Sequence, residues 1–234
     1  MSRRKSPLRK SPDPGFAMSL TLFIGNKAYS SWSLRPWLLL RALEIPFAEV
    51  VTPLYVDGSR ERMLREAPTG KVPVLRDGDV AVWDSLAIIE YLAEKLLDRG
   101  VWPKEGCARA HARSLCAEMH SGFQGLRQAC PTNFRRARRA QPLPLEEAAR
   151  ADLARIEAIF TETPARHGGP FLFGDFSAAD AFYAPVASRL DTYALALNAP
   201  ARAYCDKVLG LPAFRQWREG AQAESWVIEK WEDL

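Results

Sequence analysis

The pattern of apolar residues changes once along this chain, close to Gly100. Up to that point, short apolar runs typical of strands alternate with segments whose apolar residues recur every three or four positions, as in helices. Beyond it the strand-like runs stop and only the helical spacing continues. The 234 residues therefore predict an α/β unit followed by an all-helical unit.

The α/β part reads in the order strand, helix, strand, a weaker helix, two strands and a helix. Its strongest local signal is Asp77-Gly78, because this pair tolerates the positive φ angles of a tight hairpin turn. The expected strands are 20–24, 47–52, 72–76 and 80–83, and the expected helices are 30–43 and 84–98.

The helical part contains several amphipathic segments. Leu115, Met119, Phe123 and Leu126 form one apolar stripe within an expected helix at 107–130. Further helices are expected at 146–163, 177–197, 201–209 and 212–223, and glycine and proline within 99–106 indicate a linker. We expect domains at 18–99 and 107–234, preceded by an extension at 1–17.

Residues 1–17 hold five basic side chains and one acidic one, which accounts for the whole formal charge of +4. The rest of the chain is neutral and gives no reason to expect a nucleic-acid partner. The segment has no apolar run of about 7 to 15 residues, so it does not resemble a secretory signal peptide. We interpret it as a disordered extension or as sequence upstream of a start at Met18; the alternative is an arm for nucleic acid or an anionic membrane.

Cysteine and histidine usage argues against disulfides and metal centres. The four cysteines form no CxxC pair, and the three histidines show no metal-ligand spacing. A chain of this length with so few cysteines is expected in the reducing cytoplasm, without a metal. No run approaches the roughly 18 apolar residues that a membrane span needs, so no membrane partner is expected.

Three serines precede the first expected helix, in the sequence Tyr-Ser-Ser-Trp-Ser-Leu-Arg-Pro at 29–36. One interpretation is capping, in which a serine oxygen accepts a hydrogen bond from an early helix N–H and Pro36 is tolerated in the first turn. The other is that a serine hydroxyl at the positive end of the helix donates to an anion. Both can hold, because more than one serine is present.

Two further features flank the hairpin, Val72-Pro73 before it and Asp84-Ser85 after it. Proline cannot donate in a strand ladder, so it marks an edge, a bulge or a cis bond. A cis bond would leave the Val72 backbone free to pair with an extended ligand. Asp84-Ser85 opens the next expected helix, and an N-cap is its plain interpretation.

Together these residues resemble the glutathione S-transferase family over about 20–223. Val72-Pro73 followed by the segment 84–92 is similar to the glutathione-site segment of that family, and 30–35 is similar to the SSCSxR motif of its zeta-like classes. The Ser-x-x-Asp arrangement at 177–180 resembles the N-capping box of the family. The resemblance implies a thioredoxin-like N-terminal domain, an all-α C-terminal domain and a homodimer.

The resemblance also implies how glutathione is held. Val72 would pair its backbone with the cysteinyl unit, with Pro73 in the cis form. Asp84 would attract the γ-glutamyl amino group, while Ser85 and the helix N-terminus would take the adjacent carboxylate. Lys71 would reach a second carboxylate.

The activity implied by the resemblance depends on Ser30, which would donate to the glutathione sulfur; Ser31 is the next candidate and Ser33 a cap. Trp32 stands where the zeta motif has cysteine, which argues against isomerase activity on maleylacetoacetate. No cysteine precedes Cys107, which argues against cysteine-type members. We therefore expect a serine-type, detoxifying transferase in which glutathione attacks a small electrophile. The alternatives are a non-catalytic binding protein of this fold and a glutathione-dependent isomerase or peroxidase.

The electrophile is expected to bind between the loop after the first strand and the helical domain. Candidate pocket residues are Trp32, Met119, Phe123, Trp226 and Trp231. For Met119 and Phe123 the competing interpretation is ordinary helix core, and for the two C-terminal tryptophans it is a core cap or a partner contact.

A run of four arginines at 135–139, with Arg127 upstream, is the remaining charge feature. A solvated loop between helices is the usual explanation for such a run. Binding of an anionic substrate and binding of nucleic acid are the alternatives.

Overall fold

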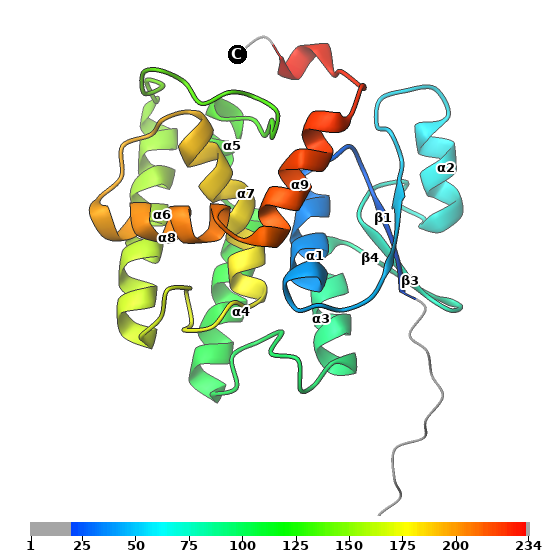
Figure 1. The fold of residues 1–234 in the computed structure, drawn as a ribbon, viewed down its shortest axis with the longest axis horizontal. Helices are drawn as coiled ribbons and strands as arrows, with labels where there is room; N and C mark the ends of the chain where they lie inside the picture. The colour runs from blue at the N-terminus through cyan, green and yellow to red at the C-terminus, as the bar shows by residue number, and fades with distance from the viewer. Residues whose placement is uncertain (1–19, 233–234) are drawn as a thin grey trace, which may run out of the picture.

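The structure is a computed structural model that describes residues 20–232. The expected extension at 1–17 lies outside the described residues. In Figure 1 the sheet and its helices form one part of the molecule, and the longer helices pack beside it with α1 between the two parts. The thioredoxin-like fold followed by a helical domain is confirmed.

A four-stranded sheet in the order β2-β1-β3-β4 organises the first part of the described chain. Strand β1 pairs in parallel with β2 and antiparallel with β3, and β3 pairs antiparallel with β4 across the predicted hairpin turn. The strands are β1 (Leu20–Ile24), β2 (Ala48–Val51), β3 (Val74–Asp77) and β4 (Val80–Trp83). The helices of this part are α1 (Ser31–Ala42), α2 (Ser59–Glu66) and α3 (Ser85–Lys95).

The two faces of the sheet have different cores. Leu20, Leu22 and Ile24 point toward α1 and α3 and belong to the main core, because alternate residues of a strand face the same side. Phe23 points the other way and packs with Met63 of α2. The main core continues into the helical part, where Trp37 of α1 and a tryptophan of the last long helix meet edge to face with ring centroids 5.1 Å apart.

The expected helix at 107–130 is broken into two. The chain turns at Gly122 and at Phe123, whose φ of 59° is left-handed. A Cβ at Gly122 would lie 2.8 Å from the carbonyl oxygen of Glu118, so the turn requires glycine. The helices of this part are α4 (Gly106–Ser121), α5 (Gln124–Ala129), α6 (Glu147–His167), α7 (Ala178–Thr192), α8 (Ala199–Leu209) and α9 (Pro212–Ala223).

Helix α7 begins at the predicted capping box. The Ser177 N–H donates to Asp180 Oδ2 at 2.9 Å, and the Ser177 hydroxyl lies 3.2 Å from the same oxygen. The helix ends at Thr192 rather than continuing to 197, since Ala194 is left-handed and Asn198 caps α8. None of the helices described in the structure is long and apolar enough to span a bilayer.

Candidate functional site

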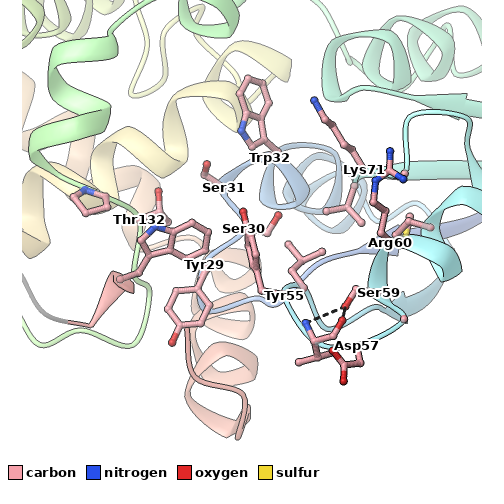
Figure 2. A pocket seen from close by; sticks show the side chains of 18 of the residues that line it. Tyr29, Ser30, Ser31, Trp32, Tyr55, Asp57, Ser59, Arg60, Lys71 and Thr132 are labelled. Carbon is pink, nitrogen blue, oxygen red and sulfur yellow. Dashed lines mark hydrogen bonds between the residues drawn. The ribbon is translucent and has the colours of Figure 1, made fainter. Parts of the chain in front are cut away.

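A cavity of about 780 Å³ lies where the start of α1, the segment that leads into α2 and the residues before β3 meet the helical domain. Figure 2 shows Ser30, Ser31 and Trp32 in one wall, with Tyr55 and Asp57 on the α2 side. The residues that line it are Tyr29, Ser30, Ser31, Trp32, Leu54, Tyr55, Val56, Asp57, Gly58, Ser59, Arg60, Glu61, Met63, Gly70, Lys71, Val72, Arg127, Pro131, Thr132, Arg189 and Trp231.

The hydroxyls of Ser30 and Ser33 form a pair at the start of α1. Ser30 is the N-cap, since its Oγ accepts from the Ser33 N–H at 3.3 Å, and the two Oγ atoms are 2.8 Å apart. Ser33 Oγ also accepts from the Gly25 N–H at 3.1 Å. The prediction that Ser33 is the cap was wrong, because Ser33 lies inside the helix. The residue with the non-helical φ and ψ of a cap is Ser30, directly before the first residue of α1.

Ser31 also lines the cavity and is buried, and no described residue hydrogen-bonds its hydroxyl. Tyr29 is held elsewhere, because its hydroxyl donates to Glu232 and accepts from Arg135 and from the Ile228 N–H. In Figure 2 its ring points away from Ser30. The phenol of Tyr29 is therefore not the hydroxyl that faces the cavity.

The Val72–Pro73 bond is cis, as predicted. Strand β3 begins only at Val74, and neither the N–H nor the C=O of Val72 is hydrogen-bonded to a described residue. Val72 therefore offers an unpaired backbone donor and acceptor to the cavity. Lys71 and Arg60, both exposed, line the same side of the cavity in Figure 2, and Arg60 was not a predicted site residue.

Asp84 and Ser85 lie at the start of α3 and, like Pro73, are outside the cavity lining. Asp84 is the N-cap, with a left-handed φ of 77°, and its carboxylate accepts from the N–H groups of residues 86 and 87. The buried Ser85 hydroxyl accepts from Arg35 at 3.2 Å. His120 Nε2 lies 3.3 Å from the outer Asp84 oxygen, a contact that the sequence did not indicate.

The expected substrate pocket needs correction at three positions. Met119, near the end of α4, and Phe123, the N-cap of α5, are both buried in the main core. Trp226 lies in a separate, smaller depression beside Lys27 and Glu224. Trp32 lines the cavity, and so does Trp231.

Part of the arginine run holds the C-terminal segment instead of facing solvent. Arg135 donates to the Glu224 carbonyl at 3.0 Å, and Arg136 donates to the carbonyl of Trp231 at 2.9 Å. Arg138 is exposed and lies 3.6 Å from Asp191. Among the four arginines the solvated-loop prediction therefore holds for Arg138, whereas Arg139 is half-buried with its Nε shielded from solvent.

The cavity is also lined by Arg127, Thr132 and Arg189. Thr132 and Arg189 were not predicted as site residues, and Arg127 was named only with the arginine run, for which anion binding was an alternative. These three residues lie on α5, on the loop after it and near the end of α7. The position of Arg189 among the apolar residues of the expected helix at 177–197 was a further signal available in the sequence.

All four cysteines are free thiols outside the cavity lining. Burial raises the pKa of Cys116 well above its ordinary value, that of Cys130 to about 11 and that of Cys205 to about 12. These three thiols are therefore protonated and unreactive near neutral pH.

Comparison with known families identifies both halves of the chain. The family model described as "Glutathione S-transferase, N-terminal domain" matches residues 29–95, and that described as "Glutathione S-transferase, C-terminal domain" matches residues 110–220.

Among curated proteins, the chain is similar to a dichloromethane dehalogenase of Methylorubrum extorquens, with 39% identity over 62 residues, 26% of this chain and 22% of that protein. A Caenorhabditis elegans protein named "Probable maleylacetoacetate isomerase" is 36% identical over 97 residues, 41% of this chain and 44% of that protein. Each match therefore spans less than half of the relative.

Among solved structures, a glutathione transferase homologue from Burkholderia with bound glutathione has a TM-score of 0.67 and 22% identity, over 88% of this chain and all of that one. A glutathione S-transferase from Rhodospirillum rubrum has a TM-score of 0.65 and 21% identity, over 90% of this chain and 94% of that one. At this identity the likeness concerns the fold alone.

Proposed function

The chain belongs to the glutathione S-transferase family, and we propose that it activates glutathione at Ser30 for attack on a small electrophile bound in the cavity. The observation that carries the proposal is the presence of a helix-capping serine and the unpaired backbone of Val72 in the wall of one cavity. An extended peptide paired with Val72 would bring a thiol to the N-terminus of α1.

The other contacts in the proposal anchor the two ends of glutathione. Lys71, joined by Arg60, takes one terminal carboxylate by charge. The γ-glutamyl end is assigned to Asp84 and Ser85, where the Ser85 N–H is hydrogen-bonded to no described residue. Asp84 attracts the amino group through its second oxygen, which is not used in capping.

Stabilisation of the thiolate can be supplied by neutral groups. A free thiol of pKa about 8.5 is roughly 3% ionised at pH 7, and lowering that pKa by about two units corresponds to about 2.7 kcal/mol. A helix N-terminus contributes about 0.3 to 1 kcal/mol when exposed and up to about 2 when partly buried. A hydrogen bond to a charged acceptor contributes about 1.5 to 3 kcal/mol.

The serine pair gives Ser30 a proton to donate. Each hydroxyl has one proton and two lone pairs, so either can be the donor between Ser30 and Ser33. With the Gly25 N–H donating to Ser33 and Ser33 donating to Ser30, the Ser30 proton points to the sulfur. The sulfur then forms a bond to the electrophilic carbon and the leaving group departs with its electron pair.

The proposal also includes a homodimer and a cytoplasmic location, as expected from the sequence. A second candidate function is a binding protein of this fold that holds glutathione without turnover. The unpaired Val72 backbone supports glutathione binding in either case. A panel of aryl halides, hydroperoxides and maleyl compounds separates the two, since a binding protein turns over none of them.

The test of Ser30 uses two variants, because Ser30 is both cap and proposed donor. Ser30→Asp keeps a cap acceptor but cannot donate a proton when ionised, and Ser30→Ala removes both. Both should lower kcat/KM for conjugation by about 10- to 150-fold, the value of a charge-assisted hydrogen bond. The matched control is Ser31→Ala, expected within about threefold of wild type because Ser31 is not in the hydrogen-bonded pair. A loss confined to Ser31→Ala would move the role to Ser31.

A further inference from the structure

Three arginines from different parts of the chain gather beside the cavity. Arg35 lies on α1, Arg127 on α5 and Arg189 on α7, and within residues 20–232 none of them is in an ion pair. Burial and then repulsion from Arg127 lower the pKa of Arg35 to about 9 and that of Arg189 to about 10. All three are therefore still cationic near neutral pH and lie close enough to repel one another.

The three side chains are held differently. Arg35 stacks on Trp32 with its guanidinium carbon 4.1 Å from the ring centroid, and it donates to Ser85, so it does not line the cavity. Arg127 lines the cavity, and it donates from Nε to the carbonyl of Gly122 at 3.0 Å and from Nη2 to the carbonyl of Met119, which leaves Nη1 without a protein acceptor in the described chain. The guanidinium carbon of Arg127 lies 5.3 Å from the centroid of the Trp32 ring.

Of the three arginines, Arg189 has the fewest hydrogen bonds to described residues. Its side chain is 6% exposed, it lines the cavity, and no hydrogen bond from its guanidinium to a described residue is present. The hydroxyl of Thr132, in the same wall, is also buried and has no hydrogen-bond partner among residues 20–232. A buried cation without a counter-charge is costly, and proteins that retain one generally pair it with an anion.

Acidic side chains of the described chain do not supply that anion. The negative charge of Asp152 partly offsets the lowering of the Arg127 pKa by burial. The Asp152 carboxylate, however, accepts from the Leu126 N–H and forms no ion pair within the described chain. Asp57 and Glu61 line the cavity from the α2 side and are exposed. Within residues 20–232 the charge of Arg189 is therefore left for a ligand to balance.

We propose that Arg189, Arg127 and Thr132 form a subsite for a carboxylate carried by the electrophilic substrate. This rests on the proposed function, in which the two carboxylates of glutathione are bound at Lys71 and at the start of α3. Guanidinium groups suit a planar carboxylate, to which they donate in pairs. Trp32 and Pro131 in the adjacent lining provide an apolar surface for an unsaturated or aromatic body.

The test compares 4-chloro-3,5-dinitrobenzoate with its methyl ester. In both, the glutathione sulfur bonds to the ring carbon, the C–Cl bond breaks and chloride leaves with its electron pair; the thiol proton has gone to solvent. After division by the uncatalysed rates, the wild-type protein should prefer the acid in kcat/KM. In Arg189→Gln the acid-to-ester ratio should fall by about tenfold or more, mainly through KM of the acid.

Two further variants make the result independent of folding yield. Arg189→Lys keeps the charge but not the paired donors, and it should give an intermediate ratio. Arg138→Gln also removes one positive charge, but from an exposed position outside the cavity lining, and it should keep the wild-type ratio. The subsite would be overturned if Arg189→Gln lowered kcat/KM equally for the acid and the ester. It would also be overturned if the substitution acted by raising the KM of glutathione.

A binding measurement separates this proposal from the proposed function. 3,5-Dinitrobenzoate has no leaving group, and calorimetry should show that it binds the wild-type protein at least about tenfold more tightly than Arg189→Gln. Such binding without turnover of either chloride would preserve the subsite and contradict the transferase proposal. Turnover of both chlorides without this binding difference would do the reverse.

Discussion

The two walls of the cavity differ in how their polar groups are satisfied. In the wall formed by the start of α1, Gly25, Ser33 and Ser30 are linked by hydrogen bonds and carry no formal charge. In the helical wall, Arg189 is a buried cation without an ion pair in the described chain. The first wall is already organised before a ligand binds, whereas in our proposal the second is completed by a ligand. This contrast suits an invariant co-substrate on one side and a selected substrate on the other.

The same contrast occurs within helix α7, which has a buried acid near its start and a buried base near its end. Asp180 accepts from the N–H groups of Leu172 and Ser177 and from the Tyr204 hydroxyl. Arg189 has no such partners in the part of the chain that the structure describes. Asp180 is therefore expected to contribute to the stability of the fold, whereas Arg189 is expected to contribute to ligand binding.

The largest effect is expected at Asp180. Asp180→Ala leaves several buried donors unpaired and should lower the free energy of unfolding by about 3 to 5 kcal/mol. Arg189→Met, which removes an unpaired buried charge, should leave that free energy unchanged or raise it. Urea unfolding of both variants measures the difference, and a comparable loss in Arg189→Met would show that Arg189 has a structural partner.

A smaller effect is expected at Ser33, which positions Ser30. Ser33→Ala removes the neutral hydrogen bond to Ser30, worth about 0.5 to 1.5 kcal/mol, so kcat/KM should fall by about 2- to 12-fold. The pH profile of kcat/KM should shift to higher pH, because the thiolate is less stabilised. Ser33→Thr keeps a hydroxyl and should restore most of the activity; a pH profile identical to wild type in Ser33→Ala would remove Ser33 from the account.

The smallest effect is expected from the cysteines. Replacing all four with alanine should leave kcat/KM for conjugation within about twofold, since no protein thiol takes part and distant sites affect activity little. Loss of turnover in a folded variant of this kind would contradict the serine mechanism. Circular dichroism and thermal unfolding verify folding, because three of these thiols are buried in the core.

Features that depend on residues close together in the chain could be predicted from the sequence. Contacts between residues far apart in the chain could not. The Ser177–Asp180 box depends on neighbouring residues and is confirmed. The cis Val72–Pro73 bond, which only the family resemblance implied, is confirmed as well. Ser30 rather than Ser33 is the cap, because three closely spaced serines leave the first residue of the helix undetermined by the sequence.

The errors in the helical wall have a different cause. An apolar stripe on a helix looks the same whether it faces a core or a pocket, so Met119 and Phe123 could not be assigned without the neighbouring helices. Arg127 and Arg189 meet only because α5 and α7 pack in one domain, which residue spacing does not reveal. The part of the cavity that we propose to select a substrate was therefore the part that the sequence did not reveal.

The most direct test of the central claim is the pKa of the glutathione thiol bound to the protein, read from thiolate ultraviolet absorbance as pH is varied. In the wild-type complex the pKa should lie about two units below that of free glutathione, and in Ser30→Ala it should rise by at least about one unit. Equal pKa values in the two complexes, or a bound thiol with the pKa of the free tripeptide, would contradict activation by Ser30.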